Sequence, residues 1–263
     1  ERLPKAAAAK LRIAEINSDI DIEAIIADVN NSNIESLIDG CDLVIDGTDN
    51  FQVRYLVNDA CVKHRKTWIY GAAVSSYGTT MTVIPNETPC LRCIFEEIPD
   101  AGSSPTCDTA GVIMPIITTV SAVQVTEAIK ILVDKTDSLH RSLMQFDVWQ
   151  NDWRKIKLSG PNPECKACGK NVYEFLDAES QEFSAVLCGR NAVQIAPPNS
   201  TAIDLKMLAD KLRALGEVKQ NEYLLRFTSG EHEITVFTDA RAIIRGTDDI
   251  AAARSLYARY VGS

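Results

Sequence analysis

Two cysteine pairs of the form Cys-x-x-Cys stand out as candidate metal ligands. Cys90 and Cys93 lie in PCLRC, and Cys165 and Cys168 lie in ECKACG. A two-residue spacer lets a tight turn direct both sulfurs at one ion, and four thiolates suit a tetrahedral zinc ion. Because a site closed by four thiolates leaves no open coordination position, we expect a structural zinc and not a catalytic one.

A second candidate site follows the apolar strand DLVIDG. Asp46, Thr48, Asp49 and Asn50 stand at its end, directly before a predicted helix. Open α/β sheets bind ligands at the carboxyl ends of their strands, and a helix N-terminus favours anions. A carboxylate there could hold Mg²⁺ against the phosphates of a nucleotide. In a plainer interpretation Asp49 or Asn50 only caps the helix, and the pattern leaves both interpretations open.

The elements that must position these residues alternate along the first half of the chain. Helices are predicted at LPKAAAAKLRIAEIN, NIESLIDG and NFQVRYLVNDACVKHR, and strands at Ile20–Val29, Asp42–Gly47, TWIYGAAV and TTMTVI. Alternation of this kind is typical of an α/β fold with a doubly wound, mostly parallel sheet covered on both faces. We therefore predict a Rossmann-like domain.

Further elements follow the first cysteine pair. The apolar run Val112–Val133 is interrupted by polar residues, which favours a buried helix over a membrane span. SLMQFDVWQ and WRKIKLS predict an antiparallel hairpin that turns at Asn151–Asp152. Beyond Glu182 a helix at Ala202–Leu215, three strand-like segments and the helix DIAAARSLYARY indicate a small α+β domain. The predicted domains are residues 1–172 and 183–263.

Composition excludes several classes of partner. The chain has 263 residues and a net charge of −9, so it lacks the basic patch expected of proteins that bind nucleic acid or anionic membranes. No secretory leader is recognisable in its opening residues. Half of the eight cysteines fall in metal-type pairs, which favours reduced thiols in the cytoplasm over a disulfide framework.

Several motifs together resemble one enzyme family. DLVIDGTDNFQVRYLVND, YGAAVSSYGTTMTV, PCLRC, TCDTAGVIMP, EAIKIL and ECKACG occur in the order and spacing of the MoeB/ThiF family, over roughly residues 3 to 170. Members resemble ubiquitin-activating enzymes and adenylate the C-terminal glycine of ubiquitin-like sulfur carriers. The resemblance implies an adenylyltransferase that uses ATP and Mg²⁺ on a ThiS- or MoaD-like carrier, in thiamine or molybdenum-cofactor synthesis. It also implies a homodimer.

The same resemblance assigns roles to single residues. Asp49 matches the family's aspartate that binds magnesium and ATP, and Asn50 adjoins the nucleotide. Lys5, in LPKA, matches a lysine that reaches the ATP phosphates, although alone it would pass for a surface lysine. Cys107, in TCDTAGV, matches a cysteine that captures the activated carboxyl or a sulfur from a persulfide donor. A lone cysteine is also often only a small buried hydrophobic residue.

Two parts of the chain depart from the family pattern. The Gly-rich nucleotide loop, G-x-G-x-x-G, is absent ahead of Leu3, so we expect an incomplete adenylation domain that does not turn over ATP by itself. The segment LCGRN around Cys188 invites comparison with a persulfide-bearing sulfurtransferase loop. It lacks the longer arginine- and glycine-bearing turn, so a docking or dimer-supporting module is the favoured interpretation of the C-terminal domain.

Two alternatives remain beside carrier adenylation. The substrate could be a peptide or a modified tRNA, as in more distant members of the superfamily. Otherwise the chain is a non-catalytic, zinc-stabilised scaffold that binds a carrier protein. Exchange of pyrophosphate into ATP in the presence of each substrate separates these hypotheses.

Overall fold

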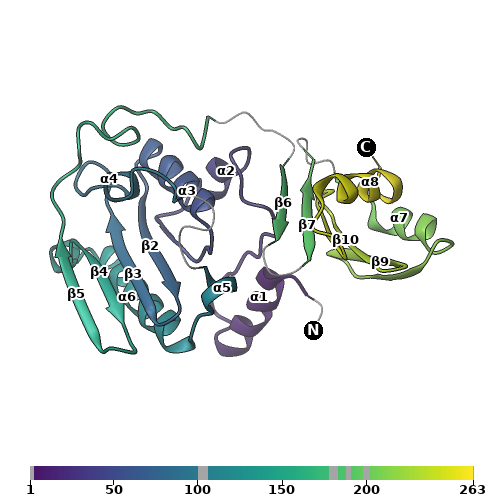
Figure 1. Ribbon diagram of the computed structural model, residues 1–263. Coiled ribbons are helices and arrows are strands. Elements are labelled where there is room, and N and C mark those ends of the chain that lie inside the picture. The colour runs from purple at the N-terminus through teal and green to yellow at the C-terminus, as the bar shows by residue number, and fades with distance from the viewer. Residues whose placement is uncertain (1–2, 100–105, 178–182, 188–190, 198–201, 263) are drawn as a thin grey trace. The chain divides into compact units, whose positions relative to one another are not determined.

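The computed structural model describes residues 3–99, 106–177, 183–187, 191–197 and 202–262 (Figure 1). The chain divides into two compact units. One is Val29–Glu179, and the other combines Glu1–Asp28 with Ser180–Ser263. The assignment of residues 1–172 to an adenylation domain and of 183–263 to a separate domain stays a prediction.

The unit Val29–Glu179 is built on a five-stranded sheet in the order β1-β2-β3-β4-β5. Its strands are β1 (Leu43–Ile45), β2 (Thr67–Val74), β3 (Tyr77–Val83), β4 (Ser142–Asp147) and β5 (Asp152–Lys157). The parallel strands β1 and β2 are joined through helix α3 (Phe51–Lys63). This βαβ unit confirms the predicted α/β class.

Parallel pairing is less extensive than the sequence predicts. The pairs β2·β3, β3·β4 and β4·β5 are all antiparallel, so the sheet is mixed. Only Ser75 and Ser76 separate β2 from β3. A connection of two residues closes a hairpin and is far too short for the crossover that a parallel pair needs.

Helices cover both faces of this sheet. On one face α3 packs with α2 (Ile34–Ile38) and α4 (Leu91–Ile94), over a core that includes Trp68, Tyr70 and Met81. On the other face lies α6 (Met114–Leu132), which buries Ile116 and Val120. Because successive strand residues point to opposite faces, the apolar run of β2 supplies both cores.

Helix α6 is the long apolar helix that the sequence predicts. Among the described residues it alone has the length and composition to cross a membrane. Its buried face includes the polar residues Gln124 and Glu127. The Gln124 amide donates hydrogen bonds to the carbonyls of Asp46 (2.9 Å) and Ile69 (3.0 Å). These contacts are those of a helix packed on a sheet.

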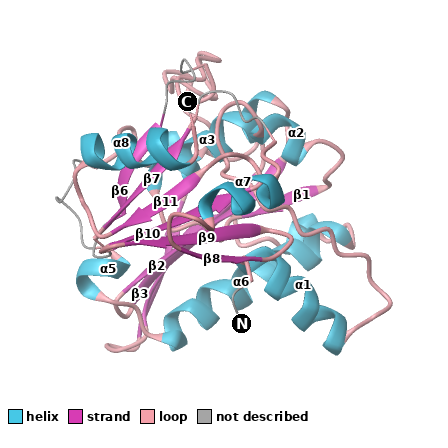
Figure 2. Ribbon diagram, turned by 90° about the vertical axis from the view of Figure 1, so that its right-hand side faces the viewer, coloured by secondary structure: helices cyan, strands magenta, loops and turns pink. Residues whose placement is uncertain are grey.

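The second unit contains a six-stranded antiparallel sheet in the order β6-β7-β11-β10-β9-β8 (Figure 2). Helices α7 and α8 pack on the same face of it, around Phe227 and Ile234. Its elements are β6 (Phe183–Leu187), β7 (Ala192–Ala196), α7 (Leu205–Leu212), β8 (Glu217–Gln220), β9 (Leu224–Ser229), β10 (His232–Phe237), β11 (Ala242–Arg245) and α8 (Ile250–Tyr260). Helix α1 (Lys5–Ile16) also belongs to this unit.

Two predicted elements differ in the structure. Ile20–Val29 is not a strand, although half-buried and exposed residues alternate from residue 21 to 28. Alternation marks a half-buried segment, but a strand also needs a hydrogen-bonded neighbour, and no described strand pairs with this segment. The helix predicted at Ala202–Leu215 is shorter, because the Asp204 carboxylate caps its N-terminus by accepting the N–H groups of Lys206 and Met207.

Close packing of α6 on the sheet makes Gly78 a sensitive position. A Cβ atom there would lie 2.6 Å from Val120 Cγ2 and 2.8 Å from Ile116 Cδ1, both in the core. We expect Gly78→Ala to lower the free energy of unfolding by about 1–3 kcal/mol, the usual cost of overpacking. Urea unfolding measures this loss. Gly160→Ala is the matched control because nothing lies within 4 Å of its added Cβ, and equal urea midpoints for the two variants would contradict the packing described.

Candidate functional site

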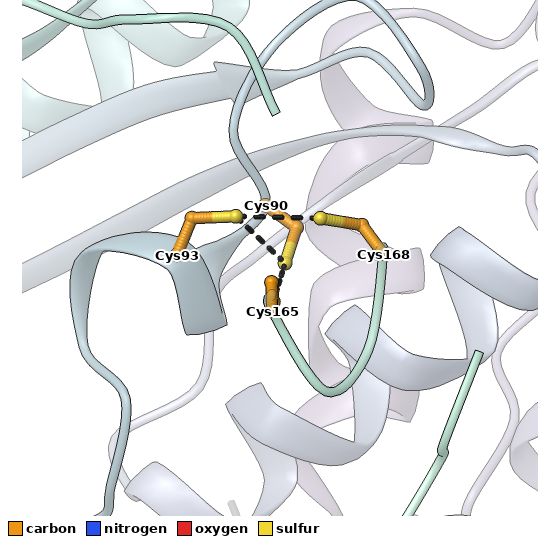
Figure 3. Close-up of side chains that lie close together, drawn as sticks. All are labelled: Cys90, Cys93, Cys165 and Cys168. Carbon is orange, nitrogen blue, oxygen red and sulfur yellow. Dashed lines mark hydrogen bonds between the residues drawn. The ribbon is translucent and has the colours of Figure 1, made fainter. Parts of the chain in front are cut away.

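The four paired cysteines converge on one point (Figure 3). Their Sγ atoms all lie within 4.8 Å of one another. Individual Sγ–Sγ distances are 3.8 Å for Cys90–Cys93, 3.6 Å for Cys90–Cys165 and 3.3 Å for Cys93–Cys168. Zinc–sulfur bonds of about 2.3 Å place tetrahedral ligands about 3.8 Å apart. The cluster therefore fits a tetrahedral metal ion, as the spacing of the pairs predicts.

Local backbone structure forms each knuckle, meaning the tight turn that carries one cysteine pair. Cys90 stands at the N-cap position of α4 without a side-chain capping bond, and its carbonyl accepts the N–H of Cys93 at 3.1 Å. In the second knuckle the carbonyl of Cys165 accepts the N–H of Gly169 at 3.0 Å. Gly169 cannot be replaced without strain, because a Cβ there would lie 2.1 Å from the Pro163 carbonyl oxygen.

The charges of these thiols favour a cation. Hydrogen bonds from Cys168, Cys90 and Cys93 hold the pKa of Cys165 far below its usual value. The pKa of Cys90 is raised by its hydrogen bonds with Cys165, Cys168 and Cys93, and by burial. Protons are thus shared among sulfurs that repel one another when ionised. A divalent ion displaces such protons and lets all four thiols bind as thiolates.

A buried ion pair supports the loop that follows β1. Arg54 Nε donates to Asp46 Oδ2 at 3.2 Å, and the Asp46 side chain is fully buried. The other carboxylate oxygen of Asp46 accepts the backbone N–H and the hydroxyl of Thr48, each at 2.8 Å. Arg54 Nη2 also donates to the carbonyls of Thr48 (2.6 Å) and Gly71 (3.2 Å). Arg54 therefore holds the loop of residues 46–48 through bonds to Asp46 and Thr48.

Asn50 and Asp49 differ in their contacts. The Asn50 side chain accepts the N–H of Val53 at 2.8 Å and caps α3, as the plainer interpretation has it. Asp49 is exposed, and among the described residues no hydrogen bond or ion pair reaches its carboxylate. A carboxylate ahead of a helix that another residue caps is available to a cation or a ligand.

Cys107 lies at the same edge of the sheet as Asp49. It begins the short helix α5 (Cys107–Ala110), it is exposed, and its thiol donates to the Ala73 carbonyl at 3.3 Å. Ala73 stands near the carboxyl end of β2, and Asp49 follows the carboxyl end of β1. Because β1 and β2 are parallel, these ends share one edge. The exposed thiol contradicts the interpretation of Cys107 as a buried hydrophobic residue.

The sequence analysis also considers Lys5 and Cys188. Lys5 is exposed at the first position of α1, in the unit that combines Glu1–Asp28 with Ser180–Ser263. The roles given to Lys5, Asp49, Asn50 and Cys107 stay predictions. Cys188 lies outside the described residues.

Sequence reasoning missed the buried polar residues of α3. Arg54 is 6% exposed, and Asn58 and Asp59 are each 0% exposed. A signal was present, since Asn50, Arg54 and Asn58 recur every four residues and so lie along one side of the helix. In an otherwise apolar helix such a row indicates buried polar contacts.

Comparison with known proteins shows the family. The ThiF family matches residues 2–167. The sulfur carrier protein ThiS adenylyltransferase of Bacillus subtilis (strain 168) is 42% identical over 264 residues, which covers 100% of this chain and 77% of that protein. The SAMP-activating enzyme E1 of Haloferax volcanii is 35% identical over 66% of this chain and 64% of its own length. The chain belongs to the ThiF family and is an adenylyltransferase.

Other relatives are less complete matches. The adenylyltransferase and sulfurtransferase MOCS3 of Culex quinquefasciatus is 32% identical, and the match covers 64% of this chain and 39% of that protein. A crystal structure of E. coli MccB with MccA-N7isoASN superimposes with a TM-score of 0.55 at 18% identity, covering 64% of this chain and 52% of the MccB chain. At that identity the MccB likeness shows the fold alone.

The Asp46–Arg54 pair generates a stability prediction. Arg54→Leu leaves a fully buried carboxylate without its cation, so we expect the free energy of unfolding to fall by about 3–5 kcal/mol. Urea unfolding measures the loss. Arg12→Leu is the control, because Arg12 pairs with Glu15 on the surface and exposed pairs contribute about 0–1 kcal/mol. Similar losses in both variants would refute the role given to the buried pair.

Proposed function

We propose that this chain takes part in the ATP-dependent adenylation of the C-terminal glycine of a ubiquitin-like sulfur carrier. The observation that carries the proposal is the 42% identity, over the whole chain, to a protein named for adenylation of ThiS. Relatives named MOCS3 match smaller parts of the chain, from 64% to 84%. We therefore favour a ThiS-like carrier and thiamine synthesis over a MoaD-like carrier and molybdenum-cofactor synthesis.

The proposed reaction is an in-line displacement at the α-phosphorus of ATP. One carboxylate oxygen of the carrier's glycine forms a bond to phosphorus as the bond to pyrophosphate breaks, which gives an acyl-adenylate. The exposed Asp49 carboxylate would hold the magnesium that accompanies the nucleotide, and Asn50 keeps this carboxylate free by capping α3 itself. Lys5 would contact the phosphates. Magnesium, when bound, offsets the negative charge that develops on the phosphoryl group.

Cys107 is the proposed nucleophile for the second step. Its thiolate would attack the acyl carbon of the adenylate and form a thioester as AMP leaves, or it would take the outer sulfur of a separate persulfide donor, which leaves as a thiol. Exposure at the start of α5 gives it the access that such an exchange needs. Its position at the edge that also carries Asp49 supports this assignment.

The cysteine cluster is proposed to hold a structural zinc ion. Cys90, Cys93, Cys165 and Cys168 would supply all four ligands, so no position remains for water or substrate. The metal would brace the fold and take no part in either chemical step.

A homodimer in the cytoplasm is part of the proposal. Helix α6 exposes an apolar row opposite its packed face, which includes Met114, Val125, Ile129 and Leu132. A second copy of the chain would cover this row. Reduced thiols at the metal cluster and at Cys107 require a reducing compartment.

A second candidate function is adenylation of a peptide. It is favoured by the likeness in fold to MccB, named a Microcin C7 biosynthetic enzyme and solved in complex with N-formylated MccA. The exchange assay described next distinguishes a peptide from a carrier substrate.

Exchange of labelled pyrophosphate into ATP tests the function and the role of Asp49. With the full-length protein we expect exchange that depends on a carrier ending in Gly-Gly and not on short peptides. Asp49→Asn should lower the exchange rate by about 100-fold or more, since it removes a charge that acts where phosphoryl charge develops. Asp42→Asn is the control, being an exposed carboxylate ahead of β1.

Three outcomes would contradict this proposal. Exchange stimulated by peptides alone would favour the peptide substrate. If the protein is folded but no substrate stimulates pyrophosphate exchange, the scaffold hypothesis is favoured. Full exchange by Asp49→Asn would remove Asp49 from the nucleotide site.

Replacement of Cys107 separates the two chemical steps. We expect Cys107→Ser to retain pyrophosphate exchange, because adenylation does not need the thiol, and to lose sulfur transfer to the carrier. Mass spectrometry of the carrier terminus measures transfer as thiocarboxylate formed. Cys41→Ser is the control, because Cys41 is also exposed but lies ahead of β1. Unchanged thiocarboxylate formation by Cys107→Ser would refute the nucleophile assignment.

A further inference from the structure

Two adjacent polar residues of α3 are fully buried without a role in the chemistry proposed above. Asn58 and Asp59 are each 0% exposed. Burying an amide or a carboxylate is unfavourable unless it makes hydrogen bonds, so the partners of these side chains show what they are for.

Asn58 bonds to the first cysteine knuckle, and Asp59 bonds to the segment that follows the second knuckle. The backbone N–H of Leu91, which follows the ligand Cys90, donates to Asn58 Oδ1 at 2.8 Å. The backbone N–H of Phe175, in the segment that follows the second knuckle, donates to Asp59 Oδ2 at 3.1 Å. Both bonds connect residues far apart in sequence. A single turn of α3 therefore bonds to the backbone of the first knuckle and to the segment that follows the second.

Glu174 links the two knuckles directly. Arg92, between the ligands Cys90 and Cys93, donates from Nη2 to Glu174 Oε2 at 2.7 Å. Lys166, between the ligands Cys165 and Cys168, donates from Nζ to Glu174 Oε1 at 2.9 Å. The Arg92 guanidinium also lies over the ring of Phe175, at 5.4 Å from the ring centroid. Glu174 and Phe175, called the strap below, thus bond to both knuckles and, through Asp59, to α3.

We propose that Asn58 and Asp59 are positioning residues of the metal centre, which hold the two knuckles at the separation that a tetrahedral ion needs. This inference rests on the proposed metal site. The knuckles are more than seventy residues apart in sequence, so an ion would otherwise have to order a long loop as it binds. Pre-positioning by α3 and the strap removes that cost from metal binding.

The charges around Asp59 agree with this role. Burial raises the pKa of Asp59 to about 6, while the Phe175 N–H and Arg92 oppose the rise. At neutral pH the carboxylate is therefore ionised, and charged acceptors make the stronger hydrogen bonds. The four thiolates bound to a divalent ion would carry a net negative charge, which Arg92 and Lys166 of the two knuckles partly offset.

The test compares metal affinity in full-length, zinc-loaded protein. Competition with a chromogenic chelator gives the apparent affinity. We expect Asn58→Leu and Asp59→Leu to weaken binding by about 10- to 100-fold, as removal of outer hydrogen-bond partners does in other metal sites. Absorption of the cobalt-substituted protein reports whether four thiolates still coordinate, and we expect the same tetrahedral spectrum.

Matched variants separate positioning from general destabilisation. Cys61→Ala truncates another buried residue of α3, one that makes no hydrogen bond to either knuckle among the described residues, and it should leave metal affinity unchanged. Asp59→Asn keeps an oxygen acceptor for Phe175, so it should bind zinc within about threefold of the native protein. Affinities of Asn58→Leu and Asp59→Leu equal to that of Cys61→Ala would overturn the proposal.

A surface variant keeps the test decisive if the leucine variants fail to fold. Glu174 is partly exposed, so Glu174→Ala removes the link between the knuckles without emptying the core. It should weaken metal binding, whereas Glu164→Ala, which breaks an ion pair within a single knuckle, should not. Equal affinities would overturn the proposal. Native protein that binds no zinc would overturn the metal site and its positioning together, while pyrophosphate exchange would still test the enzyme function separately.

Discussion

The buried polar side chains of α3 must all make hydrogen bonds, and these bonds connect distant parts of the unit Val29–Glu179. A guanidinium, an amide and a carboxylate cannot leave water without hydrogen bonds. Arg54 finds them in the loop after β1, Asn58 beside the first cysteine knuckle, and Asp59 in the strap after the second. A single thirteen-residue helix thereby connects the loop after β1 with the cysteine cluster.

This arrangement connects the cysteine cluster with the loop that carries Asp49. The N-terminal turn of α3 adjoins Asp49, and its third turn carries the contacts to both knuckles. The same helix therefore carries the residue that caps the turn beside Asp49 and the residues that bond to the backbone near the cluster.

Much of this could be predicted from the sequence, for identifiable reasons. The two Cys-x-x-Cys pairs predict the cluster because the spacing itself determines a turn that aims both sulfurs at one point. The βαβ unit of β1, α3 and β2 can be predicted because two apolar strand segments flank a helical one. The mixed sheet was missed in two places: the short β2–β3 connection was not interpreted as a hairpin, and β3 pairs with β4 across a long stretch of sequence that includes α5 and α6. The partners of Arg54, Asn58 and Asp59 were missed because local propensity says nothing about distant carbonyl and amide groups.

Hydrogen bonds also hold the chain on either side of Cys107. On one side the Tyr55 hydroxyl, from α3, contacts the carbonyls of Phe95 (2.8 Å) and Glu97 (2.9 Å) just beyond α4. On the other side Ser75, at the end of β2, pairs with Gly111 and Ile113. Contacts with α3 and with β2 therefore hold described residues ahead of Cys107 and after it. Any contribution of the cluster to the chemistry proposed for Cys107 is then geometric, because the contacts hold described residues on either side of that thiol.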